Sequence, residues 1–339
     1  MNPDRSASQA AHCLPRLAEL SAAVERYDGA APLDEAAWRT LRHDPESAAA
    51  WLVVSSGDPL RPDPPTDRAG LHFAPLLPDE PWAGAALRIR DEIHLLVAPE
   101  SRGLGIARML LDELLEGFPT ELPLTAWSHG GHPAAGRLAR HTGFRPVRDL
   151  WVLRRDAGEA LPDLPDVEGV RLLGFSDTWR EEVLRVNAAA FSDHPEQGGM
   201  DAADLAQRMA EPWFEPDGLL LAVDPDVPAG GPESLVGFHW TKRHDPETGE
   251  VYVVAVDPRA QGRGLGKLLT LAGLHHLRRA GVRHLHLYVE SDNAAALATY
   301  LGLGFTHAPA DTHVQYRRGG VTSGHASPAP ESPIAPGDH

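Results

Sequence analysis

The chain has 339 residues, a length that favours about two domains. Its 48 acidic residues exceed its 31 basic ones and give a formal net charge of −17. This excess argues against general binding to nucleic acid or to an anionic membrane. We expect neither a signal peptide nor a membrane-spanning helix, because no apolar run approaches about 18 residues. The single cysteine, Cys13, excludes an internal disulfide and multi-thiolate zinc sites, and it favours a reducing cytoplasm.

A long internal repeat organises the chain. Residues 95–108 (LLVAPESRGLGIAR) match residues 254–267 (VAVDPRAQGRGLGK), and residues 132–144 (HPAAGRLARHTGF) match residues 293–305 (NAAALATYLGLGF). Two blocks in the same order at nearly one offset predict a duplicated domain, since the period of a solenoid would be far shorter. We expect an N-terminal domain at 8–155, a linker rich in proline and acid at 156–167, a C-terminal domain at 168–318 and a disordered tail at 319–339.

Strands and helices alternate in both halves. In the first half, one helix has an apolar face formed by Ala107, Leu110, Leu111 and Leu114. In the second half, residues 219–223 and 235–241 are predicted strands separated by a turn with proline and glycine. Residues 251–256 are apolar and β-branched, which is typical of a strand buried on both faces.

The second half continues with a helix, a strand and a short helix. The first of these has a face made of Leu268, Leu271, Ala272 and His275. Gly281 can end this helix, and residues 285–289 then alternate apolar and polar side chains as a strand does. Asp292 or Asn293 can cap a short helix that runs to about Leu301. The order predicts an α/β half-domain that occurs twice.

A glycine-containing loop at residues 261–267 (QGRGLGK) lies between a predicted strand and a helix. Its backbone N–H groups and the helix N-terminus suit a pyrophosphate, and Arg259, Arg263 and Lys267 can add positive charge. The Walker pattern fails because Gln261 holds its first glycine position, and GxGxxG fails because Lys267 holds its last. The pattern that fits is Q/R-x-x-G-x-G/A, formed by Gln261, Gly264 and Gly266 in one half and by Arg102, Gly105 and Ala107 in the other.

This pattern, which follows a V-x-P strand end, resembles the coenzyme-A loop of the GCN5-related N-acetyltransferases, and both halves resemble that family over most of their length. The resemblance implies two tandem α/β domains of this family, each a mixed, mostly antiparallel sheet flanked by helices. It implies acetyl-CoA as co-substrate. The implied coenzyme-binding residues of the first half are Leu95, Leu96, Val97, Gly103, Leu104, Gly105, Ile106, Ala107 and Arg108. Those of the second half are Val254, Ala255, Val256, Gln261, Gly262, Arg263, Gly264, Leu265, Gly266, Lys267, Asn293, Ala294, Ala295, Ala296, Leu297 and Ala298.

Four segments of the second half carry a narrower resemblance. They are FSDHPEQG at 191–198, GFHWTK at 237–242, GEVYV at 249–253 and LYVESDN at 287–293. Together they resemble the mycothiol synthase family of actinobacteria. That resemblance implies acetyl transfer from acetyl-CoA to the cysteine amine of a cysteinyl-glucosaminyl-inositol, the last step of mycothiol biosynthesis. The implied acceptor-binding residues are Glu35 (with Asp34 nearly as good a candidate), Glu196, Lys242, Glu250 and Tyr288.

Glu250 and Tyr300 are the candidate catalytic residues. An α-ammonium must lose a proton before it attacks a thioester, and Glu250 at the start of the buried strand can accept that proton, by resemblance through water. The resemblance gives Tyr300 the role of protonating the departing thiolate. The alternatives are a solvated strand-end carboxylate and an ordinary core tyrosine. His132 and Ala139 replace Asn293 and Tyr300 in the first half, so we expect the second half to catalyse while the first binds acetyl-CoA or supports the fold.

Two other functions stay open: a tandem acetyltransferase for another small-molecule or protein amine, and a non-catalytic acetyl-CoA-binding module. The HPEQG, FHWTK and GEVYV segments argue against the first, and Glu250 with Tyr300 argues against the second. His284 and His286 share a strand face, but no carboxylate or cysteine pattern accompanies them, so we expect no metal site. The expected protein is a cytoplasmic monomer whose partners are acetyl-CoA and a small acceptor, with no nucleic acid or membrane.

Overall fold

The computed structural model describes residues 3–44, 47–55, 72–73, 82–116, 118–192 and 197–320. The chain forms two compact units: unit 1 comprises Met1–Leu150 with Pro309–His339, and unit 2 comprises Trp151–Ala308. Glu196 lies outside the described residues. The predicted disordered tail also lies outside them from position 321 onward. The domain limits expected from the repeat remain a prediction. No described helix has both the length and the apolar character that crossing a membrane requires.

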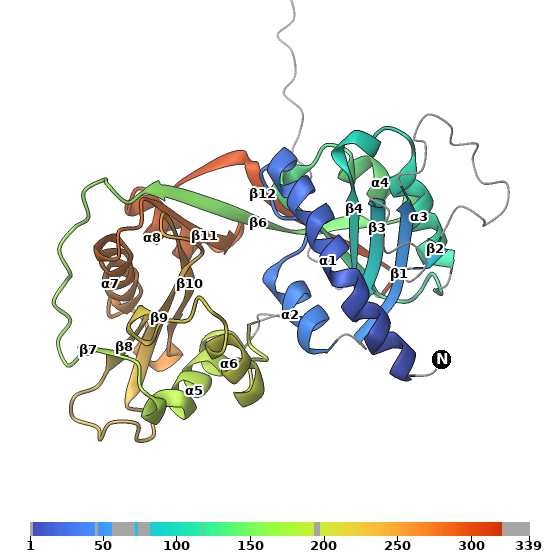
Figure 1. The fold of residues 1–339 in the computed structure, drawn as a ribbon. Helices are drawn as coiled ribbons and strands as arrows, with labels where there is room; N and C mark the ends of the chain where they lie inside the picture. Colours follow the sequence, from blue (N-terminus) through green and yellow to red (C-terminus); the bar gives the residue numbers. More distant parts are fainter. Residues whose placement is uncertain are drawn as a thin grey trace, which may run out of the picture. The chain divides into compact units, whose positions relative to one another are not determined.

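Unit 1 is a sheet flanked by helices (Figure 1). Its helices are α1 (Pro3–Asp28), α2 (Glu35–His43), α3 (Ile106–Glu116) and α4 (Ala135–Thr142), with short 3-10 turns η3 (Pro99–Ser101) and η4 (His129–Gly131). Its strands are β1 (Ala48–Ser55), β2 (His72–Phe73), β3 (Trp82–Ile89), β4 (Glu92–Val97) and β5 (Leu124–Ser128). The order is β2–β1–β3–β4–β5 and then β12 (Thr306–Arg318). β12 pairs with β5 from Val314–Ser128 to Arg318–Leu124, so a segment from far along the chain is the neighbour of β5.

Unit 2 has the same kind of architecture. Its helices are α5 (Arg180–Ala190), α6 (Ala202–Met209), α7 (Leu265–Arg279) and α8 (Ala294–Gly302), with 3-10 turns η5 (Asp177–Trp179), η6 (Pro216–Gly218) and η7 (Pro258–Ala260). Its strands are β7 (Arg171–Gly174), β8 (Leu219–Val223), β9 (Leu235–Arg243), β10 (Thr248–Val256), β11 (His284–Glu290) and the end of β6 (Arg145–Asp156). The order is β6–β11–β10–β9–β8–β7, with β7 to β10 antiparallel and β10 parallel to β11.

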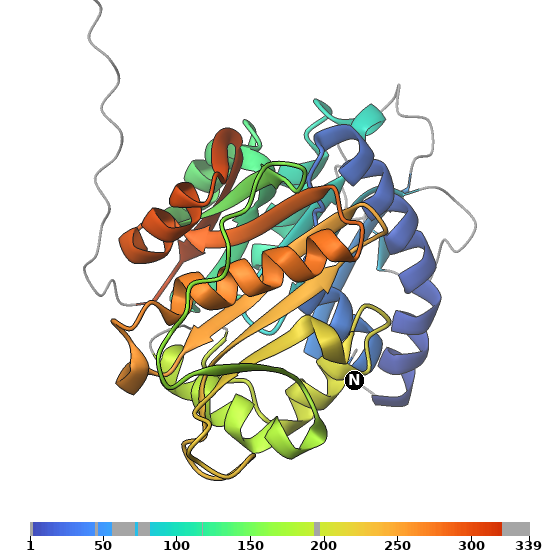
Figure 2. The same ribbon diagram turned by 90° about the vertical axis from the view of Figure 1, so that its left-hand side faces the viewer.

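Apolar side chains fill both faces of the unit 2 sheet, with α7 over one face and α5 and α6 over the other (Figures 1 and 2). The α7 face is packed by residues that include Leu271, Leu274, Leu277, Val251, Leu285 and Leu287. The opposite face is packed by residues that include Val183, Val186, Phe238, Trp240, Val253 and Ala255. Each buried aliphatic or aromatic side chain contributes about 1.5–3 kcal/mol to the free energy of unfolding. Gly237 lets α7 approach, because a Cβ there would lie 2.9 Å from Leu269.

Most predicted elements of the second half are confirmed. β8 has the predicted bounds, α7 spans the predicted face, and Asn293 caps α8 by accepting a hydrogen bond from the Ala296 N–H. β9 and β10 extend beyond the apolar runs that predicted them. Their backbone pairing continues to the Arg243–Gly249 pair, through residues whose side chains are mostly polar. This extension carries Lys242 and Glu250 into the sheet.

Candidate active site

A β-bulge in β10 sets which side chains face each side of the unit 2 sheet. The register with β9 runs from Val251–Thr241 to Val253–Trp240, so Tyr252 is an extra residue in β10. Tyr252 and Val253 therefore both pack on the α5 face, while Val251 packs on the α7 face. By the alternation of a strand, Glu250 lies on the face opposite α7.

β10 and β11 pair only over their first residues. The parallel register runs from Thr248–His284 to Glu250–His286, and within these two fully described strands no register pair follows. The backbone groups of residues 251–256 on the β11 side are thus outside that ladder. Unpaired backbone groups at a strand edge are donors and acceptors for an extended ligand. We refer to this separation of β10 from β11 as the β10–β11 opening.

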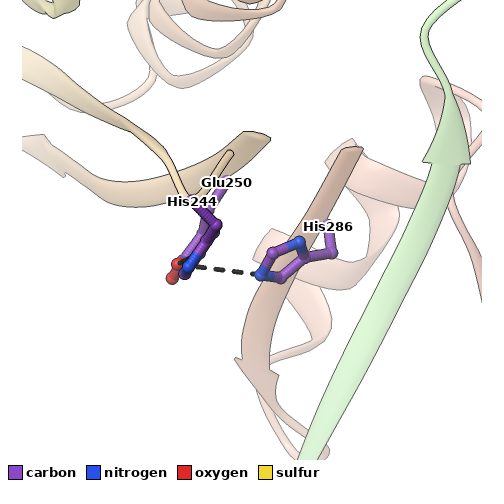
Figure 3. Close-up of side chains that lie close together, drawn as sticks. All are labelled: His244, Glu250 and His286. Carbon is purple, nitrogen blue, oxygen red and sulfur yellow. Dashed lines mark hydrogen bonds and ion pairs between the residues drawn. The ribbon is translucent and has the colours of Figure 1, made fainter. Parts of the chain in front are cut away.

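Glu250 is buried on the edge of the opening among basic side chains. His244 Nε2 lies 2.7 Å from Glu250 Oε2, and His286 Nε2 lies 3.7 Å from the same oxygen (Figure 3). Burial alone would raise the pKa of Glu250, but the His244 hydrogen bond and the charges of His286, His244 and Lys242 together hold the pKa below its ordinary value. Glu250 is therefore a carboxylate at neutral pH and can accept a proton.

The turn between β9 and β10 positions His244. Its sequence is His-Asp-Pro-Glu, and the Asp245 carboxylate accepts hydrogen bonds from the N–H groups of Glu247 and Thr248 at 2.7 and 2.9 Å. The His244 N–H donates to the Thr248 carbonyl at 3.0 Å. Such aspartate-to-backbone bonds fix tight turns. The turn thereby returns the chain so that His244 reaches Glu250.

Lys242 lies opposite Glu250 in the register and is also buried. Its ammonium lies 4.7 Å from the ring centroid of Trp213 and 5.2 Å from that of Tyr252, which is cation–π geometry. The Tyr252 hydroxyl accepts a hydrogen bond from Arg208 at 3.1 Å. Cations and aromatic rings thus line the face where a hydroxyl-rich acceptor could bind.

Tyr288 and Tyr300 lie on opposite faces of the sheet. The ring centroids of Tyr288 and His286 are 5.8 Å apart, whereas Leu285 and Leu287 pack on the α7 face. The predicted alternation of side chains along β11 is therefore confirmed. Tyr300 of α8 packs on the α7 face, where its ring is 6.1 Å from that of Phe305. Burial raises the pKa of Tyr300 to about 12, so its phenol keeps a proton that it can donate. Glu250 and Tyr300 therefore lie on opposite faces of the unit 2 sheet.

The glycine loop appears in both units with the same backbone. Gly262 and Gly264 have φ of 79° and 81°, and Gly103 and Gly105 have φ of 81° and 83°. A Cβ at any of these four glycines would meet no atom within 4 Å, so the left-handed backbone and not crowding requires glycine there. Gly264 is the N-cap of α7, so the loop presents its N–H groups at a helix N-terminus.

Three arginines near these loops are held by neighbouring groups. Arg259 forms ion pairs with Asp257 at 2.7 Å and with Glu233. Arg263 donates to the Glu168 carbonyl at 2.8 Å. In unit 1, Arg102 donates to both carboxylate oxygens of Asp28 at 2.7 and 2.8 Å, which ties α1 to the loop.

Unit 1 contains a cavity of about 630 Å³, within the range of small-molecule sites. Eight of the nine coenzyme-binding residues predicted in the first half line it, all except Leu104, which is 43% exposed. His132 and Ala139, the counterparts of Asn293 and Tyr300, also line it. The Ser128 hydroxyl lies in the same wall, buried and without a hydrogen-bond partner among the described residues. The cavity thus keeps the glycine loop and lacks a tyrosine at the position of Tyr300.

His244 is the site residue that the sequence did not single out. Its imidazole, the Glu250 carboxylate and the His286 imidazole lie within 4.8 Å of one another, which is close enough for a metal ion. The positive charges of Lys242 and Arg154 act on the same groups and oppose a further cation. The hairpin register could have indicated His244, because Lys242–Glu250 pairing brings the turn beside the carboxylate.

Comparison with known proteins agrees with this geometry. A model of the "Acetyltransferase (GNAT) family" matches residues 183–305. The mycothiol acetyltransferase of Nocardioides sp. is 52% identical over 321 residues, covering 91% of this chain and 99% of the relative. The chain belongs to the mycothiol acetyltransferase family. The family relative from Actinosynnema mirum is 45% identical and covers 88% of this chain and 94% of the relative.

A solved tandem GNAT protein from the clavulanic acid biosynthesis pathway shares the fold. Its TM-score is 0.60 at 19% identity, with coverage of 95% of this chain and 97% of that one. The tandem N-acetyltransferase fold and the family predicted from the sequence are therefore confirmed.

Proposed function

We propose that this protein transfers acetyl from acetyl-CoA to the cysteine α-amine of a cysteinyl-glucosaminyl-inositol, the last step of mycothiol biosynthesis. Membership of the mycothiol acetyltransferase family supports the reaction class. The observation that supports the proposal is the position of two groups that can move protons on opposite faces of the unit 2 sheet: the buried carboxylate of Glu250 and the phenol of Tyr300. The expected cytoplasmic location remains part of this proposal.

Glu250 is the proposed base. The acceptor enters as an ammonium, which must lose a proton before its nitrogen lone pair can attack the thioester carbonyl. The depressed pKa of Glu250 leaves it ionised, and the buried Lys242 beside it favours the neutral amine over the ammonium. The proton passes to Glu250 directly or through one water.

Tyr300 is the proposed acid. As the nitrogen–carbon bond forms and the carbon–sulfur bond breaks, negative charge develops on the coenzyme sulfur. A phenol whose pKa is raised to about 12 stays protonated until that charge appears. The phenolate is then reprotonated by the second hydrogen of the attacking nitrogen. An acetyl group held in the opening would have the amine on the Glu250 side and the sulfur on the Tyr300 side.

The β10 edge and the α7 loop are the proposed coenzyme site. Backbone groups of residues 254–256 would hold the acetyl and pantetheine arm in the way a neighbouring strand does. The loop of Gly262 and Gly264 and the N-terminus of α7 would hold the pyrophosphate. Lys267, exposed on the first turn of α7, would add positive charge.

Lys242 and Tyr288 are the proposed acceptor-binding residues of unit 2, together with Glu196, whose position is not described. In unit 1 we propose Glu35 rather than Asp34. Asp34 caps α2 by accepting a hydrogen bond from the Ala37 N–H at 2.7 Å, so its carboxylate already has a structural role.

The unit 1 cavity is a proposed second acetyl-CoA site without catalysis. The eight lining residues that match the coenzyme pattern support binding, and Ala139 leaves no phenol at the position that Tyr300 holds in unit 2. A mass-spectrometric assay tests the function: incubation with acetyl-CoA and cysteinyl-glucosaminyl-inositol should add one acetyl group to the acceptor. No gain on this acceptor, with transfer to an unrelated amine, would overturn the substrate assignment. Binding of acetyl-CoA with no transfer to any amine would favour the non-catalytic alternative.

A further inference from the structure

A buried base must lose its proton before the next turnover, and Glu250 is poorly placed to lose it to water. Its side chain is 8% exposed, whereas that of His244 is 36% exposed. His244 Nε2 and Glu250 Oε2 are 2.7 Å apart, a normal length for a charge-assisted hydrogen bond. One hydrogen bond therefore connects the buried carboxylate to a side chain that reaches solvent.

We propose that His244 is the positioning residue for Glu250 and relays its proton to solvent in each catalytic cycle. This inference rests on the proposed acetyl transfer. Of the three hydrogens on the acceptor ammonium, one stays on the amide nitrogen and one reaches the coenzyme sulfur through Tyr300. The third passes to Glu250, then to His244 Nε2, and leaves from the imidazole to water. The nitrogen–carbon bond forms, the carbon–sulfur bond breaks, and one proton is released for each acetyl group transferred.

His286 is unsuited to the relay. Burial, with smaller contributions from His244, Arg154 and Lys242, lowers the pKa of His286 to about 4 against the opposing charge of Glu250, so its imidazole is neutral in the working range. Its Nε2 is 3.7 Å from Glu250 Oε2, beyond hydrogen-bond distance. Its side chain is 10% exposed, so a proton on it would remain buried.

Titratable and charged groups from several elements surround His244. Glu250 faces it from β10, His286 from β11 with ring centroids 5.0 Å apart, and Asp245 follows it in the turn. Lys242 of β9 and Arg154 of β6 act on the same cluster. The two cations make a divalent metal at His244, Glu250 and His286 unfavourable, and they favour release of a proton toward solvent.

The His244→Gln variant separates proton transfer from hydrogen bonding, because glutamine keeps an N–H donor but takes up no proton. We expect kcat for acetyl transfer to fall at least about tenfold while the KM for the acceptor changes less than about twofold. Imidazole added to the assay should restore part of kcat, because the site is partly open to solvent, and the solvent deuterium isotope effect on kcat should rise. His284→Gln, which replaces an exposed histidine on β11, should keep the wild-type kcat.

Three results would overturn the relay: wild-type kcat in His244→Gln, a loss that imidazole does not restore, or loss of wild-type activity on treatment with a metal chelator. The last result would make the imidazoles metal ligands. Failure of the proposed function is distinguishable, because the wild-type protein itself would then transfer no acetyl to the acceptor. The proposed relay would then be wrong as well, because it depends on that transfer.

Discussion

Glu250 lies directly opposite Lys242 in the antiparallel pair of β9 and β10, and both side chains are buried. A buried carboxylate and a buried ammonium are each costly alone, and each lowers the cost of the other. His244 adds a hydrogen bond to the carboxylate, and Trp213 and Tyr252 cover the ammonium. A polar site is thus built into a strand pair whose other residues are largely apolar, next to the β10–β11 opening.

Replacing the proposed base should slow the chemical step. Glu250→Gln keeps the shape of the side chain but cannot accept a proton, so we expect kcat to fall about 10²-fold or more at neutral pH. Steady-state kinetics with saturating acetyl-CoA measures the effect. Circular dichroism of the same preparation checks the fold, because the change leaves Lys242 without its carboxylate. An unchanged kcat would leave Glu250 as an ordinary strand-end residue.

The proposed acid can be tested against its counterpart in unit 1. Tyr300→Phe removes only the hydroxyl, and we expect kcat to fall about 10²-fold with little change in the KM for the acceptor. Ala139→Ser, which alters the matching position of unit 1, should leave kcat within about twofold. Similar losses in both variants would contradict the assignment of catalysis to unit 2.

The two glycine loops should differ in their effect on turnover. Gly264→Ala strains a backbone with φ of 81°, and we expect the KM for acetyl-CoA in the transfer assay to rise about tenfold. Gly105→Ala imposes the same strain at φ of 83° in unit 1 and should leave that KM nearly unchanged. Equal increases in both variants would refute the proposed division of labour.

Gly273 is required for space and not for its backbone angle. A Cβ there would lie 2.0 Å from the ring of the fully buried His239, so Gly273→Ala should lower the free energy of unfolding by about 1–3 kcal/mol or more. Gly266→Ala, in the same helix with no atom within 4 Å of the added Cβ, should be neutral or stabilising by up to about 1 kcal/mol. Urea unfolding of the two variants measures the difference. Equal stabilities would show that His239 moves aside at little cost.

His239 should make stability depend on pH. Burial lowers the pKa of His239 to about 4, below the ordinary value near 6.5, so between these values the unfolded chain binds a proton that the folded chain excludes. The contribution of the neutral imidazole to the free energy of unfolding is complete above about pH 6.5. Below that pH the free energy of unfolding falls by about 1.4 kcal/mol per pH unit. Urea unfolding at several pH values should show a shallower slope for His239→Asn than for the wild-type protein. Parallel slopes would contradict the burial of a neutral imidazole.

Local signals in the sequence predicted the elements around the opening, and long-range pairing produced the parts that were missed. The apolar run at 251–256 and the glycine loops each specify their own conformation, so they were predictable. The bulge at Tyr252 and the approach of His244 to Glu250 depend on the register between two strands, which composition does not encode. The pairing of residues 314–318 with β5 could not be predicted either, because no local sequence signal indicates which strand those residues join.

The proposed reaction transfers acetyl to the cysteine α-amine of the acceptor, with Glu250 as the base and Tyr300 as the acid. The most direct measurement is release of coenzyme-A thiol from acetyl-CoA with two acceptors: cysteinyl-glucosaminyl-inositol and the same molecule with its amine already blocked. We expect one thiol per free-amine acceptor, an amide product, and no release with the blocked acceptor. Equal release with both acceptors would contradict it.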